Sequence, residues 1–413
     1  MRRRNRMIFT SLSPNAEWDD AILGLRLALS RPHTDDHAQE EILLARLRKS
    51  FAVPHAFLFE SGRSALASLL RAIPLQAGDE VILQAFTCVA VPNAVLWAGG
   101  TPRYVDCMRE TYTMSPEDLE KNITPKTRAV IIQHTFGIPA DMDRLIDIAR
   151  ARNLIVIEDC AHAIGSTYRG TQIGGYGHAA ILSFGRDKAL SSVFGGAALA
   201  RDADLAVRLQ RIHAQLPYPS DGWVLRQLLH PLLTHSVKKT YGAGVGKVLL
   251  KAFRLSRLLY PAVTKEERKA LRPAFAFHAM PRQLAALANH QWEKLENMND
   301  HRRMLANIYR DLFKDVFGIA TPRVPSDRDV IFLRYPLRVS DPRAALSRCR
   351  AYGIHLGDWY DSPIAPRDVA LDAIGYQIGS CPMAEDLARH TINMPTSIGV
   401  SPDDARRIVA CLR

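Results

Sequence analysis

The chain has 413 residues, of which 47% are apolar and 23% charged, and 54 lysines and arginines against 42 aspartates and glutamates give it a formal charge of +12. This composition supports a large hydrophobic core and excludes a disordered tail or a fibrous protein. The positive charge fits an anionic partner, but charge alone does not choose among nucleotides, lipid head groups and nucleic acid.

The cysteines and the N-terminal residues predict a cytoplasmic protein. The six cysteines are scattered and form no Cys-x-x-Cys pair, so we expect neither a disulfide scaffold nor a metal site. Residues 1–6 are basic, but the apolar stretch that follows them is too short for a secretory signal. Because no 18 uncharged apolar residues run together, we also expect no membrane-spanning helix.

Short apolar runs alternate with helix-like stretches between about residues 50 and 200, which is typical of strands joined by crossover helices. Residues 81–83, 129–132 and 154–157 are predicted strands that are buried on both faces. The acidic turn at residues 141–143 predicts the start of a helix between the last two strands. The sequence therefore predicts an α/β domain with a largely parallel sheet.

A basic segment follows at residues 223–272, which contains eleven lysines and arginines but only two glutamates. Helical spacing places its basic side chains Lys247, Lys251, Arg254 and Arg257 opposite an apolar face. That face consists of Val245, Val248, Leu249, Ala252, Phe253, Leu259 and Tyr260. Two interpretations stay open: the helix lies on an anionic membrane surface, or it packs on the protein and exposes its basic face to solvent.

The last third of the chain is predicted to contain a long helix from about residue 281 to 313, a strand at 332–335, and helical structure from 384 onward. We therefore divide the chain into four parts. They are an N-terminal arm (1–40), a large domain (41–222), the basic amphipathic helical insertion (223–272), and the long helix with a small C-terminal domain (273–413).

Three segments are candidate ligand sites, each with a plainer interpretation. Asp159 follows a predicted buried strand, where ligands bind in open α/β sheets, although it could simply cap the next turn. Lys188 lies between Ser183 and a glycine pair at 195–196, which also fits an ordinary surface loop. The Ser-Gly-x-Ser sequence at 61–64 opens a helical run, as in a phosphate site or a plain helix cap.

Together and in this order, these segments resemble the DegT/DnrJ/EryC1/StrS family of sugar aminotransferases. The resemblance implies the pyridoxal-phosphate-dependent transferase fold (fold type I), an α/β fold. Its large domain has a mostly parallel central sheet flanked by helices, and a smaller C-terminal α/β domain follows. The matching segments cover nearly the entire chain and are residues 61–66, 78–82, 99–102 with 105–106, 136–143, 158–162, Ser183-Phe184 with Lys188, Gly195-Gly196, and 384–385 with 393–395.

The resemblance also implies a role for each site residue. Lys188 would bond to the aldehyde of pyridoxal phosphate and then carry a proton during catalysis. Asp159 would pair with the pyridine nitrogen, and His162 would hydrogen-bond the 3-oxygen of the cofactor. The remaining cofactor contacts would come from Gly62, Arg63, Ser64 and Ser183 around the phosphate and from Cys88 at the ring.

Three departures from the family pattern concern the cofactor. Cys88 stands where family members carry a ring-stacking aromatic residue, and Phe86 is a candidate to share that face. Arg63 replaces a threonine of the phosphate loop. Residues 275–280, including Phe277, replace an Asn-x-Arg-Met sequence whose asparagine reaches the phosphate of the partner subunit. We expect the charge of Arg63 to compensate for that lost contact.

Three further residues are candidate substrate contacts: His134, Trp359 and Tyr360. For each of them, a structural role in the core is an alternative of similar weight.

The sequence thus predicts a homodimeric aminotransferase, cytoplasmic or on the inner face of a membrane. It would move an amino group, with glutamate as the expected donor, to a keto group of a nucleotide-linked sugar for polysaccharide or glycan biosynthesis. The alternatives are a pyridoxal-phosphate-dependent sugar dehydratase, whose family members lack the lysine, and a regulator or membrane-associated scaffold with a degenerate site. A nucleic-acid partner is not expected, since only the charge favours it.

Overall fold

A seven-stranded sheet forms the centre of the structure, a computed structural model that describes residues 7–30 and 37–413. The sheet has the order β2-β11-β10-β7-β6-β3-β5. Its strands are β2 (His55–Phe59), β3 (Glu80–Gln84), β5 (Thr101–Val105), β6 (Thr127–Gln133), β7 (Ile155–Asp159), β10 (Ala179–Ser183) and β11 (Gly196–Ala200). β11 runs antiparallel to both of its neighbours, and the other pairs are parallel. The predicted mostly parallel sheet is confirmed, whereas the basic residues 1–6 lie outside the described residues.

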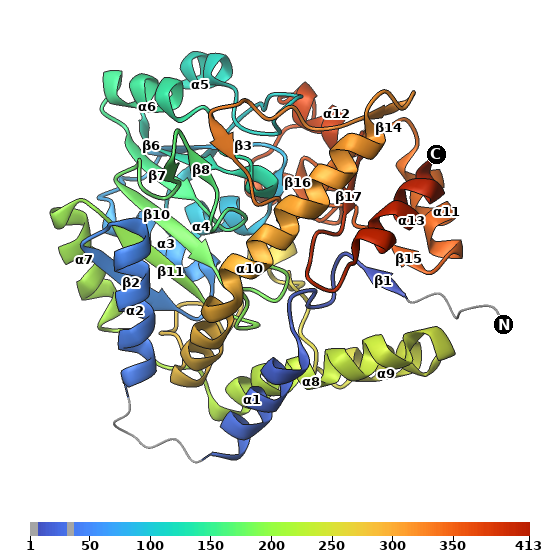
Figure 1. Cartoon of the computed structure of the whole chain (residues 1–413). Helices are drawn as coiled ribbons and strands as arrows, with labels where there is room; N and C mark the ends of the chain where they lie inside the picture. Colours follow the sequence, from blue (N-terminus) through green and yellow to red (C-terminus); the bar gives the residue numbers. More distant parts are fainter. Residues whose placement is uncertain (1–6, 31–36) are drawn as a thin grey trace.

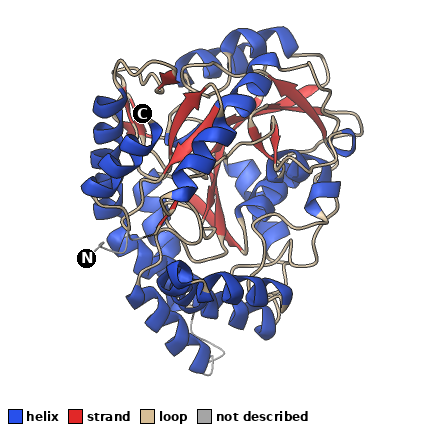
Figure 2. Ribbon diagram, turned by 90° about the vertical axis from the view of Figure 1, so that its right-hand side faces the viewer, coloured by secondary structure: helices blue, strands red, loops and turns tan. Residues whose placement is uncertain are grey.

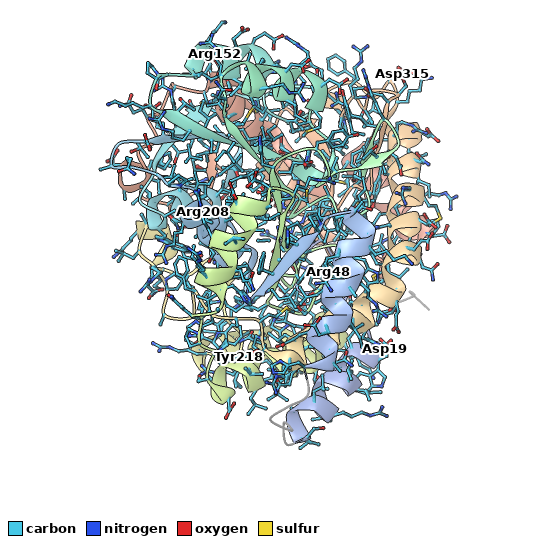
Figure 3. The ribbon with its side chains drawn as sticks, turned by 90° about the vertical axis from the view of Figure 1, so that its left-hand side faces the viewer. Asp19, Arg48, Arg152, Arg208, Tyr218 and Asp315 are labelled. Carbon is cyan, nitrogen blue, oxygen red and sulfur yellow. The ribbon has the colours of Figure 1, made fainter. Side chains whose placement is uncertain are left out.

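Helices cover both faces of this sheet (Figures 1 and 2). On one face lie α3 (Gly62–Ala72), α4 (Ala90–Trp97) and α7 (Ala203–His213), and on the other α2 (Ala38–Phe51), α5 (Pro116–Asn122), α6 (Met142–Ala151) and α10 (Arg282–Phe313). Successive strand residues alternate between the two layers: Ile131 packs in the first, and Val130 and Ile132 pack in the second. This explains why the strands appear as continuous apolar runs. Figure 3 shows the side where Arg48 of α2 and Arg208 of α7 lie on the outer surface.

A smaller C-terminal domain follows the long helix α10. It contains an antiparallel sheet of β12 (Ile319–Ala320), β14 (Tyr335–Val339) and β17 (Thr391–Met394), with α11 (Pro342–Ala351), α12 (Pro382–His390) and α13 (Pro402–Leu412). Three short pairings tie distant segments together: β1 (Ile8–Phe9) with β15 (Ile354–His355), β4 (Thr87–Cys88) with β16 (Ile364–Ala365), and β13 (Arg328–Asp329) with β8 (Thr167–Tyr168) and β9 (Thr171–Gln172).

The predicted strand at residues 332–335 is wrong in position, because the strand begins at Tyr335. Residues 332–334 instead form a buried loop, in which Phe332 has a φ of +47° and the backbone N–H of Leu333 donates to the carbonyl of Phe136 at 2.9 Å. An apolar run therefore marked a buried segment correctly but not its backbone conformation.

The basic segment forms two helices, α8 (Asp221–Thr240) and α9 (Val245–Leu255). α8 is integral to the large domain, because Trp223, Val224 and Leu228 belong to its core, and α8 packs on α1 (Trp18–Leu29). α9 is the predicted basic amphipathic helix, but it ends before Leu259 and Tyr260. Figure 1 shows it at the periphery, away from the central sheet. Within the described ranges, no helix is long and apolar enough to cross a membrane.

Candidate active site

A cavity opens where the sheet strands β7 and β10 end, beside the start of α3, and its empty space, open solvent included, is about 1140 Å³. Segments 333–334 and 359–360 of the C-terminal part close it from the other side. Nine of the residues predicted from the sequence line this cavity: Gly62, Arg63, Cys88, Asp159, His162, Ser183, Lys188, Trp359 and Tyr360. The fold therefore gathers side chains that are up to 298 positions apart in the chain.

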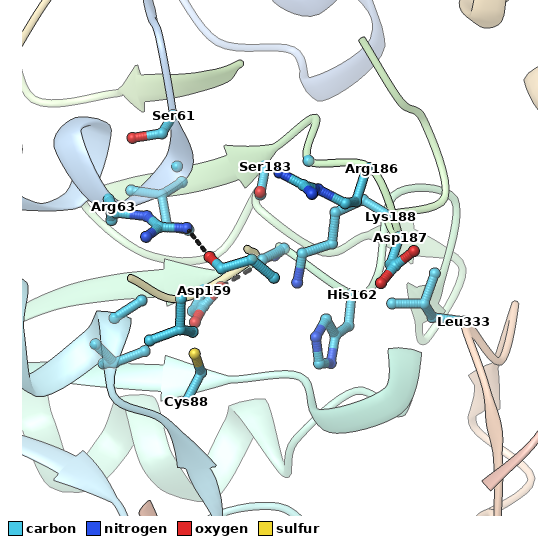
Figure 4. Close-up of a pocket in the computed structure, with 18 of the residues that line it drawn as sticks. Ser61, Arg63, Cys88, Asp159, His162, Ser183, Arg186, Asp187, Lys188 and Leu333 are labelled. Atoms are coloured by element: carbon cyan, nitrogen blue, oxygen red, sulfur yellow. Dashed lines mark hydrogen bonds between the residues drawn. The ribbon is translucent and has the colours of Figure 1, made fainter. Parts of the chain in front are cut away.

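Lys188 lies in the turn after β10, and its amine points to the space between Asp159 and His162 (Figure 4). The turn is held by the Lys188 N–H, which donates to Gly185 at 3.0 Å, and by the Asn15 side chain, which donates to the Lys188 carbonyl at 2.6 Å. Burial lowers the pKa of the Lys188 amine to about 8, while the charge of Asp159 opposes this shift. A larger fraction of the amine is thus uncharged and nucleophilic near neutral pH.

Asp159 is the last residue of β7 and only 6% exposed. Its Oδ1 accepts a hydrogen bond from the Ala161 N–H at 3.0 Å, while Oδ2 has no hydrogen-bond partner in the part of the chain that is described. Burial raises the pKa of Asp159, and the Ala161 N–H and the charge of Lys188 act against this rise. A carboxylate with one free oxygen at a buried cavity is suited to pair with a ligand N–H or a cationic ring nitrogen.

His162 is held as a neutral ring with a defined tautomer. Its Nδ1 accepts a hydrogen bond from the Phe136 N–H at 3.3 Å, so the ring proton is on Nε2. Burial lowers the pKa of His162 well below its usual value, and the positive charges of Lys188 and Arg334 add to this. The ring lies nearly parallel to Phe136 and Tyr360, with centroids 6.4 and 6.2 Å away. His162 therefore offers a hydrogen-bond donor to a ligand.

The start of α3 and the end of β10 form an end of the cavity suited to an anion. Ser61 caps α3 by accepting a hydrogen bond from the Ser64 N–H, which leaves the first N–H groups of the helix available. A Cβ at Gly62 would lie 2.8 Å from the Cβ of Ser183, so only glycine lets the helix begin this close to the strand. The Ser183 hydroxyl adds a further donor beside these N–H groups.

Ser64 does not line the cavity, contrary to the prediction that it contacts the cofactor. Its hydroxyl donates to the carboxylate of Glu60 and accepts a hydrogen bond from the Phe277 N–H at 3.0 Å. Because helical geometry turns each residue about 100° from the last, Ser64 points into the core while Gly62 and Arg63 border the cavity. Ser64 therefore fixes the loop from beneath.

His134 is also placed outside the cavity, contrary to its predicted substrate contact. It is fully buried; its Nδ1 accepts a hydrogen bond from the Ala140 N–H at 3.1 Å, and its Nε2 lies 3.4 Å from the carboxylate of Glu158. Both ring nitrogens are thus used within the core, and the alternative of a structural histidine is the one the geometry supports.

Two aromatic residues discussed for the cofactor face elsewhere. Phe86 packs edge-on against Tyr360 at 5.2 Å, behind the cavity wall, and does not share the position of Cys88. Phe277 lies between the guanidinium groups of Arg71 and Arg272, at 3.9 and 5.4 Å from its ring centroid. Phe277 is buried at 7% exposure and is therefore part of the core of its own chain.

Sequence reasoning missed several residues of the cavity wall. Phe136, Leu333 and Arg334 reach it from loops, and the Arg334 guanidinium lies 5.2 Å from the Trp359 ring centroid. Arg186 also lines the cavity, two positions before Lys188. Arg186 was visible in a candidate motif, but nothing local shows which way its side chain points.

Known proteins are similar to this chain along most of its length. A model of the DegT/DnrJ/EryC1/StrS aminotransferase family matches residues 38–217 and 263–413, which leaves out residues 218–262 with α8 and α9. The UDP-N-acetyl-3-dehydro-alpha-D-glucosamine 3-aminotransferase of Acidithiobacillus ferrooxidans is 28% identical over 376 residues, covering 91% of this chain and 88% of that protein. GDP-perosamine synthase of Escherichia coli O157:H7 is 36% identical over 189 residues, covering 46% of this chain, and the match spans half of that enzyme.

A solved structure extends the likeness to the whole fold. The crystal structure of DesV from S. venezuelae superposes with a TM-score of 0.75 at 27% sequence identity, covering 99% of this chain and 98% of that one. The likeness therefore includes both the central sheet and the C-terminal domain.

Proposed function

Because the chain belongs to the DegT/DnrJ/EryC1/StrS aminotransferase family, we propose that it transfers an amino group from an amino acid to a keto group of a nucleotide-linked sugar. The cofactor is pyridoxal phosphate. Three functional side chains that converge on one cavity carry the proposal: the amine of Lys188, the carboxylate of Asp159 and the imidazole of His162. The amino sugar produced would serve polysaccharide or glycan biosynthesis.

The residues of the cavity fit each chemical group of pyridoxal phosphate. The free oxygen of Asp159 suits the pyridine N–H, and the Nε2–H of His162 suits the 3-oxygen. The first N–H groups of α3, beside Gly62 and Arg63, and the Ser183 hydroxyl suit the phosphate. Cys88 lines the cavity and would contact the ring, and burial raises the pKa of its thiol, which favours the neutral, polarisable form.

When bound, the cofactor supplies a conjugated ring that accepts electrons as the substrate C–H bond breaks. Lys188 would hold the cofactor aldehyde between turnovers and would afterwards carry the proton of that C–H bond. Asp159 would keep the ring nitrogen protonated by placing a negative charge beside it in a buried site. Phe136 and Tyr360, whose rings stack with their centroids 6.0 Å apart, would exclude water from their side of the cavity.

We propose glutamate as the amino donor, which leaves as the 2-oxo acid. The purified protein is expected to absorb at about 410 to 430 nm through its lysine-bound cofactor, and added glutamate is expected to shift the band to about 330 nm. Difference spectra recorded in parallel with glutamate, glutamine and buffer test this, with a keto-sugar nucleotide added last to restore the original band. If glutamine alone shifts the band, glutamine replaces glutamate as the proposed donor. If no amino acid shifts the band, the aminotransferase proposal is contradicted.

Two alternative functions are less well supported. Lys188 argues against a dehydratase, since dehydratases of this family lack that lysine. A regulator with a degenerate site would not need the polar cavity groups to be oriented, yet both Asp159 and His162 are fixed by backbone N–H donors. We further propose that the enzyme works as a homodimer, as the family resemblance implies.

We also propose that α9 contacts an anionic membrane surface. Its inward side packs on the protein through Gly246, Leu249, Leu250 and Phe253, which are buried or half-buried. Its outward side exposes the apolar Val245, Val248 and Leu255 next to the basic Lys247, Lys251 and Arg254. An apolar strip beside a basic strip is the arrangement that lies at a negatively charged lipid interface.

The α9 proposal predicts binding to vesicles that contain phosphatidylserine, but not to neutral phosphatidylcholine vesicles, at low salt. Each basic side chain near an anionic surface contributes about 1 kcal/mol, so reversing two charges with Lys251→Glu and Arg254→Glu is expected to weaken binding at least about 30-fold. The matched control is Lys121→Glu with Lys126→Glu, which changes the net charge equally at two exposed lysines far from α9 in the chain. Co-sedimentation with vesicles measures the binding of the wild type and of both double variants. If the wild type does not bind at low salt, or if the control variant loses as much binding as the α9 variant, the proposed membrane contact is contradicted.

A further inference from the structure

Arg186 is the cavity residue whose charge the proposed function has not used. It follows Ser183 and Gly185 in the turn that leads to Lys188, and it lines the cavity. Its Nη1 donates to the Tyr260 carbonyl, and its guanidinium lies 5.3 Å from the ring centroid of Phe194. Its Nη2 is buried and has no hydrogen-bond partner among residues 7–30 and 37–413.

Arg186 also lacks a direct partner for its charge among the described residues. It makes no ion pair with any described carboxylate, whereas the neighbouring Arg63 is paired with the buried Glu267. Burial lowers the pKa of Arg186 to about 10; the charge of Asp187 opposes this shift, and the charges of Arg63 and Arg254 add to it. Two guanidinium groups around one cavity, one of them with a free buried N–H group, form an environment that an anion would stabilise.

Both arginines are anchored by the same short stretch of backbone. The Tyr260 carbonyl accepts from Arg186, and the Ala262 carbonyl accepts from Arg63 Nη2 at 2.9 Å. This stretch ends the segment 218–262, which the family model does not match. The segment that contains α8 and α9 therefore also builds part of the active-site wall and fixes two cations there.

The position of Arg186 selects the phosphate end of the cavity. In Figure 4, Ser183 lies between Arg63 and Arg186, and the Arg186 side chain extends toward Ser183. Ser183 in turn meets the start of α3, where the free N–H groups lie. A phosphate carries up to two negative charges and several acceptor oxygens, which suit these donors together.

We propose that Arg186 binds the phosphate group of pyridoxal phosphate through its free Nη2, and that residues 260–262 hold Arg186 and Arg63 in position for it. This inference rests on the proposed function, because it assigns a further contact to the same cofactor. It gives the segment 218–262 a second task besides the presentation of α9.

Cofactor binding with and without the phosphate tests the assignment. Protein freed of cofactor is titrated with pyridoxal phosphate and with pyridoxal, which has the same aldehyde and no phosphate, and the visible band of the lysine-bound form is followed. Arg186→Met is expected to weaken binding of pyridoxal phosphate by about 10- to 100-fold, the effect of one charge-assisted hydrogen bond, and to leave pyridoxal within about twofold. Arg226→Met is the matched control, because Arg226 also bonds to Tyr260, at 3.2 Å, but does not line the cavity.

Each outcome has a definite meaning. If Arg186→Met weakens the binding of pyridoxal phosphate and of pyridoxal equally, Arg186 is only structural. If the affinity for both is unchanged and the KM for the sugar nucleotide rises, Arg186 binds a substrate phosphate instead. Either result overturns the proposal. If circular dichroism shows that Arg186→Met does not fold, Arg186→Lys keeps the charge, loses the fork of donors, and is expected to weaken pyridoxal phosphate selectively by a smaller factor. A wild-type protein that forms no band with either aldehyde would instead overturn the proposed function itself.

Discussion

Replacing Lys188 with alanine is expected to abolish transamination, with a loss of about 10³-fold or more in kcat. Lys188 is the amine that the cavity presents between Asp159 and His162, and its pKa of about 8 makes it both a nucleophile and a proton carrier near neutral pH. Alanine can do neither, while the groups proposed to hold the ring nitrogen and the phosphate stay in place. The variant should therefore still bind pyridoxal phosphate but lack the band of the lysine-bound form.

The control for this prediction is Lys126→Ala, which removes an exposed lysine from the surface and should leave kcat unchanged. Amino-sugar formation measured by mass spectrometry, together with the visible spectrum, distinguishes lost chemistry from lost cofactor. If Lys188→Ala keeps full activity, the lysine has no part in the mechanism and the assignment of the site is wrong.

Replacing Asp159 with asparagine is expected to lower kcat by about 10²- to 10⁴-fold without unfolding the protein. The Ala161 N–H donates to Oδ1 and would keep the amide oxygen of asparagine on its side. The amide NH₂ would then face the ring nitrogen, so that a neutral donor stands where a negative acceptor is needed. The ring nitrogen would lose its proton, and the ring its capacity to accept electrons.

Stability provides the second readout for Asp159. Its pKa is raised in the folded protein, so the charged form is disfavoured by folding at neutral pH, and a neutral amide removes that cost. The melting temperature of the cofactor-free variant at pH 7 should therefore not fall. Asp147→Asn, on the exposed side of α6, is the control and should leave both kcat and stability unchanged. An active Asp159→Asn enzyme, or one that melts far below the wild type, would contradict the assigned role.

Local sequence patterns predicted the fold and most of the site. Doubly buried strands need continuous apolar residues, and a helix start needs a capping side chain, so β6, β7, α3 and α6 could be located from a few neighbouring residues. Asp159, Ser183 and Lys188 follow such elements directly, and parallel strands bring their carboxyl ends to one edge. Their convergence on one cavity therefore follows from the order of elements along the chain.

The direction of single side chains was decided by tertiary contacts. Ser64 and His134 occupy plausible positions in the sequence, but hydrogen bonds with the Phe277 N–H and the Glu158 carboxylate, which only the fold brings near, hold them in the core. The segment at 332–334 is apolar enough for a strand, yet it packs as a loop against Phe136. In each case the partner that fixes the side chain or the backbone is distant in sequence.

The sequence by itself thus determined the family, the alternation of strands and helices along the chain and the residues able to carry the chemistry, because these depend on residue type and short-range spacing. Only the tertiary structure decided which side chains reach the cavity, and it brought Tyr260 and Ala262 to Arg186 and Arg63 across 74 and 199 positions of the chain. Such pairings depend on how helices and loops pack in three dimensions, because a guanidinium group bonds to whichever carbonyl the fold places within reach.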